Sequence, residues 1–356
     1  MREDISLKQG FAMLFIFLSG GIMAIGGGSE AGRDSYISAI LCLVFVIPLY
    51  FCYYTPFIML EKKNFFEILA FAYGEKLGKI VNLIYFMSVF LVAVVSFSRF
   101  TLFIKTVALT NTSMVLIGFF MAFTCLFATF NGFEVLARFS EIMLVVVIFS
   151  VATFVIISIT LFKVVNLQPL LENGVKPMVL GVYSISSMPF MEAFALIAMI
   201  SQNRKKKDMQ KIVFLSAICS SVTIAVIFLR NLLVLGYPAI ESLYYPSYLA
   251  VSLVSFGDFF ERQEVAVSIV FMIADIVKIT ALSIFLCKSI NFSAKTKEYK
   301  YYAPAVILLI FSFSIAFFSN TMKLFQFFSI YKYILGAPFV ILPVITLLLC
   351  KIRCKK

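Results

Sequence analysis

Four ionisable side chains lie deep inside long apolar stretches of the sequence: Arg99, Glu192, Asp275 and Lys278; Arg230 lies close to the outer end of another. A charged side chain in a membrane-spanning segment almost always pairs with another charge or faces a water-filled cavity. Asp275 and Lys278 are three residues apart, so on a helix they share a face and can neutralise each other. Such groups can hold a charged small molecule or carry a proton. Structural pairing is the competing interpretation, and for Arg99 so is snorkelling to the interface.

Two of the apolar stretches also contain residues that weaken a helix. The first has adjacent glycines, Gly20 and Gly21, and each glycine costs a helix about 1 kcal/mol relative to alanine. The other has Pro189, three residues before Glu192, and proline removes one backbone hydrogen bond and clashes with the preceding turn. An unwound helix leaves N–H and C=O groups without partners and places partial charges at the ends of the two halves.

An amino acid carries one carboxylate and one ammonium group, which together match both kinds of freed backbone group. We therefore interpret the two places as parts of one ligand site. The competing interpretations are close helix packing for the glycines and an ordinary kink for the proline. The candidate ligand-binding residues are Ser19, Gly20, Gly21, Ile22, Phe90, Ser187, Pro189 and Glu192.

The residue types that usually carry catalysis or bind metals are missing or scattered. His is absent, which removes the usual proton shuttle and the commonest transition-metal ligand. The seven cysteines show no metal-ligand spacing, and the sequence contains neither a Walker motif nor a glycine-rich dinucleotide motif. We therefore predict no enzymatic activity, no cofactor and no metal.

The elements that must position these residues are membrane-spanning helices. Of the 356 residues 62% are hydrophobic and only 13% are charged, against about a quarter charged in soluble domains. The apolar residues come in blocks of about twenty without strict alternation, which favours spanning helices over a barrel. The sequence predicts one all-α transmembrane domain with ten spans, near 8–30, 34–58, 80–109, 113–130, 140–163, 179–200, 212–236, 264–288, 301–319 and 332–350.

The basic residues predict the orientation of these helices. With the ten spans in place, 20 Lys and Arg residues fall on one side, seven on the other and three within spans. Because cytoplasmic loops carry the excess of Lys and Arg, both termini are predicted to lie in the cytoplasm. The net charge of +12 is therefore read as a topology signal, and no nucleic-acid partner is predicted.

Three connections are predicted to carry structure. Residues 59–79 read as a short amphipathic helix ending near Gly78, and residues 237–263 read as one or two short interfacial helices. The glycine run at 26–28 leads into Glu30, Arg33 and Asp34, which are predicted to form a polar turn on the outer side.

At this point several short strings, in order and over nearly the whole chain, resemble the B-type integral membrane subunit of bacterial spore germinant receptors (the GerAB family). That family is a branch of the amino acid–polyamine–organocation (APC) superfamily. The strings are ISLKQ at 5–9, RDSYIS at 33–38, YGEKLGK at 73–79, GFEVLAR at 132–138, LQPLLENG at 167–174, KP at 176–177 and PFME at 189–192.

The resemblance implies a LeuT-like fold of two inverted five-helix repeats, about 8–163 and 179–350, in which the first and sixth helices are broken. It implies an inner spore membrane location, an A-type membrane subunit and a C-type lipoprotein as partners, and binding of a small nutrient such as an amino acid. One departure concerns the first helix: family members often have a proline near its outer end, and here glycines occupy that stretch.

Two functions follow from these expectations. The first is a nutrient-sensing receptor subunit that binds its ligand in the middle of the membrane and triggers germination. The second is a proton-coupled amino-acid permease on the same scaffold, with Glu192 or Asp275 as the proton carrier. A membrane-embedded enzyme would need convergent acid, base or metal groups, and the sequence shows none.

Overall fold

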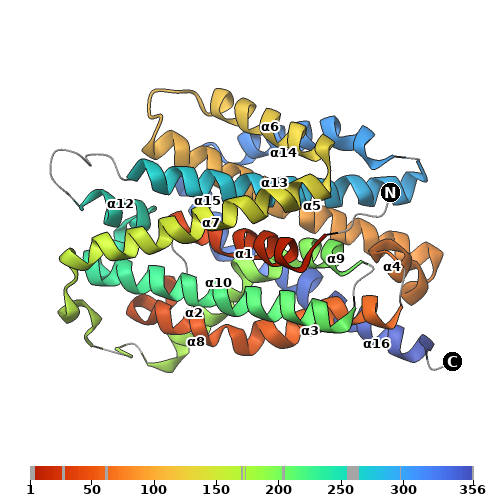
Figure 1. The fold of residues 1–356 in the computed structure, drawn as a ribbon, viewed down its shortest axis with the longest axis horizontal. Coiled ribbons are helices and arrows are strands. Elements are labelled where there is room, and N and C mark those ends of the chain that lie inside the picture. The colour runs from red at the N-terminus through yellow and green to blue at the C-terminus, as the bar shows by residue number, and fades with distance from the viewer. Residues whose placement is uncertain are drawn as a thin grey trace.

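The computed structural model describes residues 5–25, 29–60, 63–169, 171–172, 174–202, 205–254, 264–296 and 298–354. Within these ranges every regular element is a helix. Figure 1 shows the long helices running in roughly one direction, with α1 near the middle of the bundle. The chain therefore has the all-α architecture that its apolar blocks predict.

The first half of the chain contains seven α-helices and three short 3-10 helices within the described residues. They are α1 (Leu7–Ile25), η1 (Ser29–Asp34), α2 (Ser35–Leu41), α3 (Leu43–Met59), α4 (Phe65–Tyr73), α5 (Glu75–Val107), α6 (Met114–Asn131), α7 (Phe133–Ser158), η2 (Ile159–Leu161) and η3 (Val164–Leu167).

The second half begins with an interrupted helix and ends with another. Its elements are α8 (Val175–Ile185), η4 (Ser186–Phe190), η5 (Met191–Ala193), α9 (Phe194–Ser201), α10 (Lys206–Leu235), α11 (Tyr237–Ser242), α12 (Pro246–Ser252), α13 (Glu264–Ala294), η6 (Tyr299–Tyr302), α14 (Ala303–Phe317), α15 (Thr321–Gly336), η7 (Ala337–Ile341) and α16 (Leu342–Cys354).

Eight helices of the described chain are long and apolar enough to cross a membrane, or nine if the bent pair Glu30–Leu41 and Leu43–Met59 counts as one span. Leu7–Ile22 is a shorter apolar helix. Each of the ten predicted spans overlaps one or more of these helices. The count of ten and the inverted repeat stay predictions.

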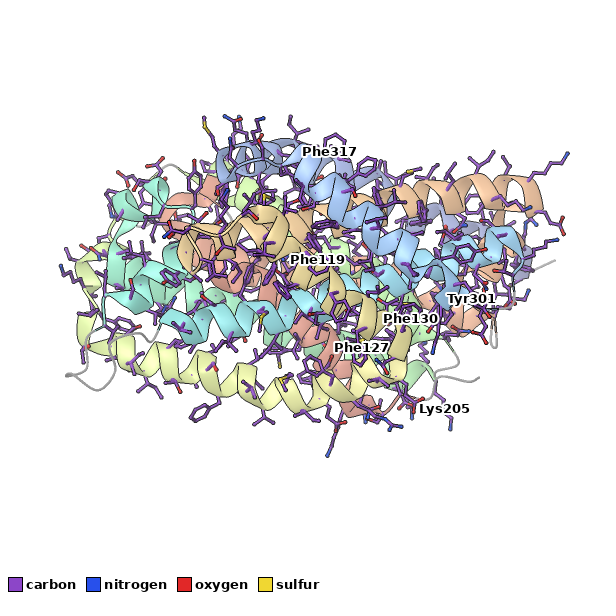
Figure 2. All side chains as sticks on the ribbon, turned by 90° about the horizontal axis from the view of Figure 1, so that it is seen from above. Phe119, Phe127, Phe130, Lys205, Tyr301 and Phe317 are labelled. Carbon is purple, nitrogen blue, oxygen red and sulfur yellow. The ribbon has the colours of Figure 1, made fainter. Side chains whose placement is uncertain are left out.

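The outer surface of the bundle is apolar. Phe119, Phe127 and Phe130 of α6 and Phe317 of α14 are all more than a third exposed, and Figure 2 shows them on the outside of the ribbon. The interior, in contrast, contains α13 and the interrupted helix Val175–Ser201. In the most apolar 18-residue segment of each, 83% of the residues are buried. An apolar outside around a partly polar inside is the arrangement that lipid requires.

The predicted short helix after α3 exists as α4, but it ends earlier than expected. The side chain of Asn64 accepts from the backbone N–H of Glu67, and the Glu67 carboxylate accepts from the backbone N–H of Asn64, which fixes the start of α4. Gly74 has φ +83°, a conformation that favours glycine, and it ends α4. Gly78, the predicted end, instead lies inside α5, where it packs against the backbone of Ala70. The two short helices predicted within 237–263 appear as α11 and α12, while residues 255–263 lie outside the described part.

The predicted break at Ser19-Gly20-Gly21 is wrong, because α1 continues as a regular helix from Leu7 to Ile25. A methyl group on Gly20 would overlap the Cβ of Ala274 on α13, so this glycine serves close helix packing. The glycine run at 26–28 lies outside the described residues.

The predicted break at Pro189 is confirmed. A π-helical turn, η4, separates α8 from α9, and inside it Met188 has the non-helical angles φ −128° and ψ 109°. Proline cannot donate a backbone hydrogen bond, so the regular ladder stops here. The carbonyl of Phe190 accepts a hydrogen bond from the hydroxyl of Tyr50 on α3 at 3.0 Å. A neighbouring helix therefore satisfies one of the backbone groups at the interruption.

Candidate functional site

The four charges predicted inside the spans form two ion pairs that join different helices. The guanidinium of Arg99 on α5 donates to the carboxylate of Asp275 on α13 at 2.5 Å. The ammonium of Lys278, one turn further along α13, donates to the carboxylate of Glu192 at the helix interruption. All four side chains are at most 1% exposed. The predicted pairing of Asp275 with Lys278 is therefore replaced by bonds from each to another helix.

A tyrosine completes the second pair. The hydroxyl of Tyr331 on α15 donates to the other oxygen of the Glu192 carboxylate at 2.6 Å. The ammonium of Lys278 also lies 5.0 Å from the ring centre of Phe17 on α1, a distance at which a cation is attracted to the ring face. We name Arg99, Glu192, Asp275, Lys278 and Tyr331 the charge group.

Gly21 gives the Arg99 guanidinium its room. A Cβ on Gly21 would lie 2.6 Å from a terminal nitrogen of Arg99, closer than atoms of that kind can approach. The absence of a side chain on α1 thus lets the guanidinium lie against that helix. Arg99 Nε and Asp275 Oδ2 are both buried without a hydrogen-bonding partner among the described residues. The charge group therefore contains a donor atom and an acceptor atom that its own bonds leave free, and its formal net charge is zero.

Four of the other candidate residues are buried within their own helices, and the fifth, Phe90, lies elsewhere. Ser19, Ile22, Ser187 and Pro189 are buried; the hydroxyl of Ser19 donates to the carbonyl of Phe15 at 2.7 Å and that of Ser187 donates to the carbonyl of Tyr183 at 2.9 Å. Both of these hydrogen bonds close within one helical turn, so they hold the side chains against their own helices.

Phe90 lies apart from the charge group. It is on α5 nine residues before Arg99, roughly 13 Å along the helix, and its ring packs against Phe86 and against Phe313 of α14. The structure does not bring Phe90 together with Glu192.

Sequence reasoning missed Tyr331 and Lys332 on α15. Lys332 lies at the start of the last predicted span, 332–350, where a charge needs no buried partner, and an aromatic residue in an apolar helix carries no signal of its own. The sequence predicts Glu30 only as part of a polar turn, whereas in the structure its carboxylate accepts from the Lys332 ammonium at 2.5 Å. The sequence indicated only that the charges inside the spans need partners, and it did not indicate which residues those partners are.

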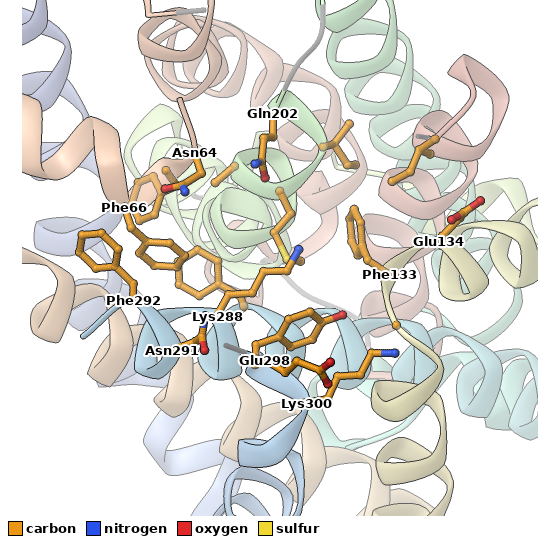
Figure 3. Close-up of a pocket in the computed structure, with 18 of the residues that line it drawn as sticks. Asn64, Phe66, Phe133, Glu134, Gln202, Lys288, Asn291, Phe292, Glu298 and Lys300 are labelled. Atoms are coloured by element: carbon orange, nitrogen blue, oxygen red, sulfur yellow. The ribbon is translucent and has the colours of Figure 1, made fainter. Parts of the chain in front are cut away.

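A cavity of about 880 Å³ opens at the end of the bundle where α1 begins. Figure 3 shows Lys288 extending between the rings of Phe66 and Phe292 on one side and Phe133 on the other. Residues from α4, α9, α13 and the turn between α6 and α7 contribute to its wall. The wall contains none of the candidate ligand-binding residues. In this structure the charge group therefore lies in packed surroundings beyond the cavity.

Comparison with known proteins decides the family. The sequence profile described as "Spore germination protein" matches residues 4–347. The chain belongs to the spore germination protein family. It is similar to a protein named spore germination protein KB from Bacillus subtilis (strain 168), with 23% identity over 320 residues, which covers 88% of this chain and 86% of that protein.

The family assignment and the apolar helices together make this chain an integral membrane protein with a germinant-receptor type of role. Membership of the APC superfamily is consistent with that family.

Proposed function

We propose that this chain is the nutrient-binding subunit of a spore germinant receptor and that the charge group binds the nutrient, an amino acid. The observation that carries the proposal is the Glu192 carboxylate, which lies in the helix interruption and is held there by Lys278 and Tyr331. A second carboxylate and a guanidinium stand next to it on α13 and α5. Family membership supports the receptor role.

The chemistry of the charge group matches a zwitterion. Removing one partner of a buried ion pair is costly because it leaves a charge uncompensated in a low dielectric. An amino acid offers both signs, so its ammonium group can replace Lys278 at Glu192 while its carboxylate takes the freed Lys278 ammonium. Alternatively its carboxylate takes the guanidinium of Arg99, and Lys278 then pairs with the freed Asp275. Every buried charge keeps a partner throughout this exchange, which makes it more favourable than binding a ligand of a single charge.

Exchange of partners also supplies a signal. In the free state Lys278 links α13 to the interruption and Tyr331 links α15 to it. A ligand that takes over Glu192 removes these links and thereby favours a second arrangement of α13, α15 and the interrupted helix. Ligand binding shifts such an equilibrium by the difference in affinity for the two arrangements.

The remaining features belong to the same proposal. We propose ten spans arranged as inverted repeats over about 8–163 and 179–350, both termini in the cytoplasm and residence in the inner spore membrane. The excess of Lys and Arg on one side supports the orientation. We propose as partners an A-type membrane subunit and a C-type lipoprotein, on the basis of the family resemblance.

Replacement of Glu192 by Gln tests the nutrient site. Glu192→Gln keeps the shape but removes the charge that would bind the ammonium group. A lost partner in a buried charge pair costs about 2–5 kcal/mol, so spores should need at least about thirtyfold more nutrient. The measurement is the dose–response of nutrient-triggered germination, with the amount of subunit in the membrane checked by immunoblot. Glu134→Gln is the matched control, because Glu134 forms an exposed pair with Arg138 on α7. An unchanged dose–response at normal subunit levels would remove Glu192 from the site.

A proton-coupled permease is the second candidate, and the buried carboxylates of Glu192 and Asp275 favour it. Uptake of labelled amino acids into proteoliposomes containing only this chain separates the two. Accumulation that follows an imposed pH gradient establishes the permease. No uptake by the chain alone, together with a nutrient response only in the presence of partner subunits, establishes the receptor.

A further inference from the structure

The residue after Tyr331 makes its own set of bonds at the end of the bundle away from the cavity. The ammonium of Lys332 donates to Glu30 at 2.5 Å and to the hydroxyl of Ser184 at 3.3 Å. Its carbonyl accepts from the hydroxyl of Tyr183 at 3.0 Å. Lys332 therefore ties α15 to η1, the turn that follows α1, and to α8, which leads into the helix interruption.

This end of the bundle is fastened by further bonds of η1. Arg33 donates to the carbonyl of Gln168 at 2.6 Å and pairs with Glu172 at 3.2 Å, and the Asp34 carboxylate accepts from the backbone N–H of Leu171 at 3.1 Å. The opposite end is hollow, because the large cavity has Ile5 and Gln202 in its wall. These two residues lie just before the start of α1 and just past the end of α9.

Tyr331 and Lys332 are adjacent on α15 but bond to residues at different depths in the bundle. Tyr331 is 1% exposed and bonds Glu192 within the charge group. Lys332 bonds Glu30, whose side chain is 30% exposed, so water reaches this pair but not the charge group. Any movement of this turn of α15 that breaks the Lys332–Glu30 pair also shifts Tyr331 relative to Glu192.

We propose that Glu30 and Lys332 form a latch that positions Tyr331 on Glu192 and closes the path from the Glu30 end to the charge group. The inference rests on the proposed function, since under the proposed topology the Glu30 end faces the outside, from which the nutrient arrives. Opening the latch admits a zwitterion and releases the Tyr331 hydroxyl in the same step. Lys332 and Glu30 act on the nutrient site through Tyr331 and are positioning residues.

Access to a reporter cysteine tests the latch directly. Ser187 is fully buried, its hydroxyl lies 3.5 Å from the backbone carbonyl of Lys332, and it precedes Glu192 by five residues in the interruption. Ser187→Cys should therefore react slowly with a membrane-impermeant thiol reagent. Adding Lys332→Gln should raise the labelling rate about tenfold, which corresponds to about 1.4 kcal/mol, in right-side-out vesicles and not in inverted ones. Each rate is corrected for the same variant without Ser187→Cys, because the chain has seven native cysteines.

Two controls identify the pair as the cause. Lys323→Gln, on the first turns of the same helix and exposed, should leave the labelling rate unchanged. The charge swap Glu30→Lys with Lys332→Glu should restore slow labelling, while either half of the swap alone should not. Equal labelling of Ser187→Cys with and without Lys332→Gln overturns the latch.

A reversible cross-link covers the case in which Lys332→Gln fails to accumulate. Glu30→Cys with Lys332→Cys, oxidised in spores, should abolish the nutrient response, and reduction should restore it. A full response in the cross-linked state overturns the proposal. The labelling rate does not depend on recognition of a nutrient. Faster labelling in Lys332→Gln together with a normal dose–response in Glu192→Gln would therefore retain the latch and reject the proposed nutrient site.

Discussion

At the scale of single residues, the buried charges are organised across helices and not along one helix. Asp275 and Lys278 share a face of α13, yet their bonds go to Arg99 on α5 and to Glu192 at the interruption. Each pair therefore holds two elements at a fixed separation. The balance of two positive and two negative groups keeps the charge group neutral, which is the condition under which such buried ions persist.

Breaking the Arg99–Asp275 pair should destabilise the protein strongly. Asp275→Asn leaves the Arg99 guanidinium without its counter-ion while 1% exposed, so we expect a loss of about 3–5 kcal/mol in the free energy of unfolding. Thermal unfolding in detergent, followed by loss of the monodisperse peak in gel filtration, measures the change.

The matched control for Asp275→Asn is Glu134→Gln, which breaks an exposed pair and should cost about 0.5 kcal/mol or less. The double change Arg99→Met with Asp275→Leu should regain much of the lost stability, because it removes both charges. Similar losses from Asp275→Asn and Glu134→Gln would show that the buried pair is not holding α5 to α13.

The sequence identified four of the five members of the charge group because a charge in an apolar block stands out. It did not identify Tyr331, because the role of its hydroxyl depends on the hydrogen bond to Glu192, a residue on another helix. Nor did it show the partners of Asp275 and Lys278, because spacing along one helix says which residues share a face and not which helix meets that face. Phe90 illustrates the same limit, as its ring turns to α14.

At the scale of elements, α1 and the interrupted helix both contain residues of low helix propensity, but these residues have different structural effects. The glycines of α1 and the proline after α8 all weaken a helix locally. The proline interrupts its helix because it lacks an N–H, whereas the glycines keep the helical ladder intact and give up only side-chain volume. Local propensity therefore predicted the break at Pro189 correctly and the break at Gly20 wrongly.

A methyl group at Gly20 should be far more damaging than one at Gly10 of the same helix. The Cβ of Gly20→Ala would overlap the Cβ of Ala274 on α13, which cannot move without its backbone. The Cβ of Gly10→Ala would come within 2.9 Å of the end of the flexible Ile212 side chain, which can move aside. We expect a loss of about 1–3 kcal/mol for Gly20→Ala from overpacking and little change for Gly10→Ala. Resistance to heating in detergent provides the comparison, and equal resistance of the two variants would refute close packing of α1 on α13.

At the scale of the whole molecule, the apolar blocks and basic connections predicted the helical bundle well, because burial in lipid depends on composition more than on pairing. The sequence could not show that the 880 Å³ cavity lies at one end of the bundle, or that η1 is joined to α8 and α15 at the other. That difference arises from contacts such as Lys332 with Glu30, which are 302 positions apart in the chain.

The proposed orientation predicts which cysteines can be labelled from each side. Cys354, exposed near the end of α16, should react with an impermeant thiol reagent only in inverted vesicles. A cysteine placed by Asn111→Cys, exposed between α5 and α6, should react only in right-side-out vesicles. Labelling of both from the same side would contradict an arrangement with cytoplasmic termini.

The position of α1 has a consequence for how the chain is made. Its side chains from Ala12 to Leu18 are at most 3% exposed, and it packs against α7, α10 and α13, which the ribosome synthesises much later. α1 therefore makes these native contacts only after much of the protein has followed. Because the side chains from Ala12 to Leu18 are apolar, α1 can remain in lipid until α10 and α13 enclose it.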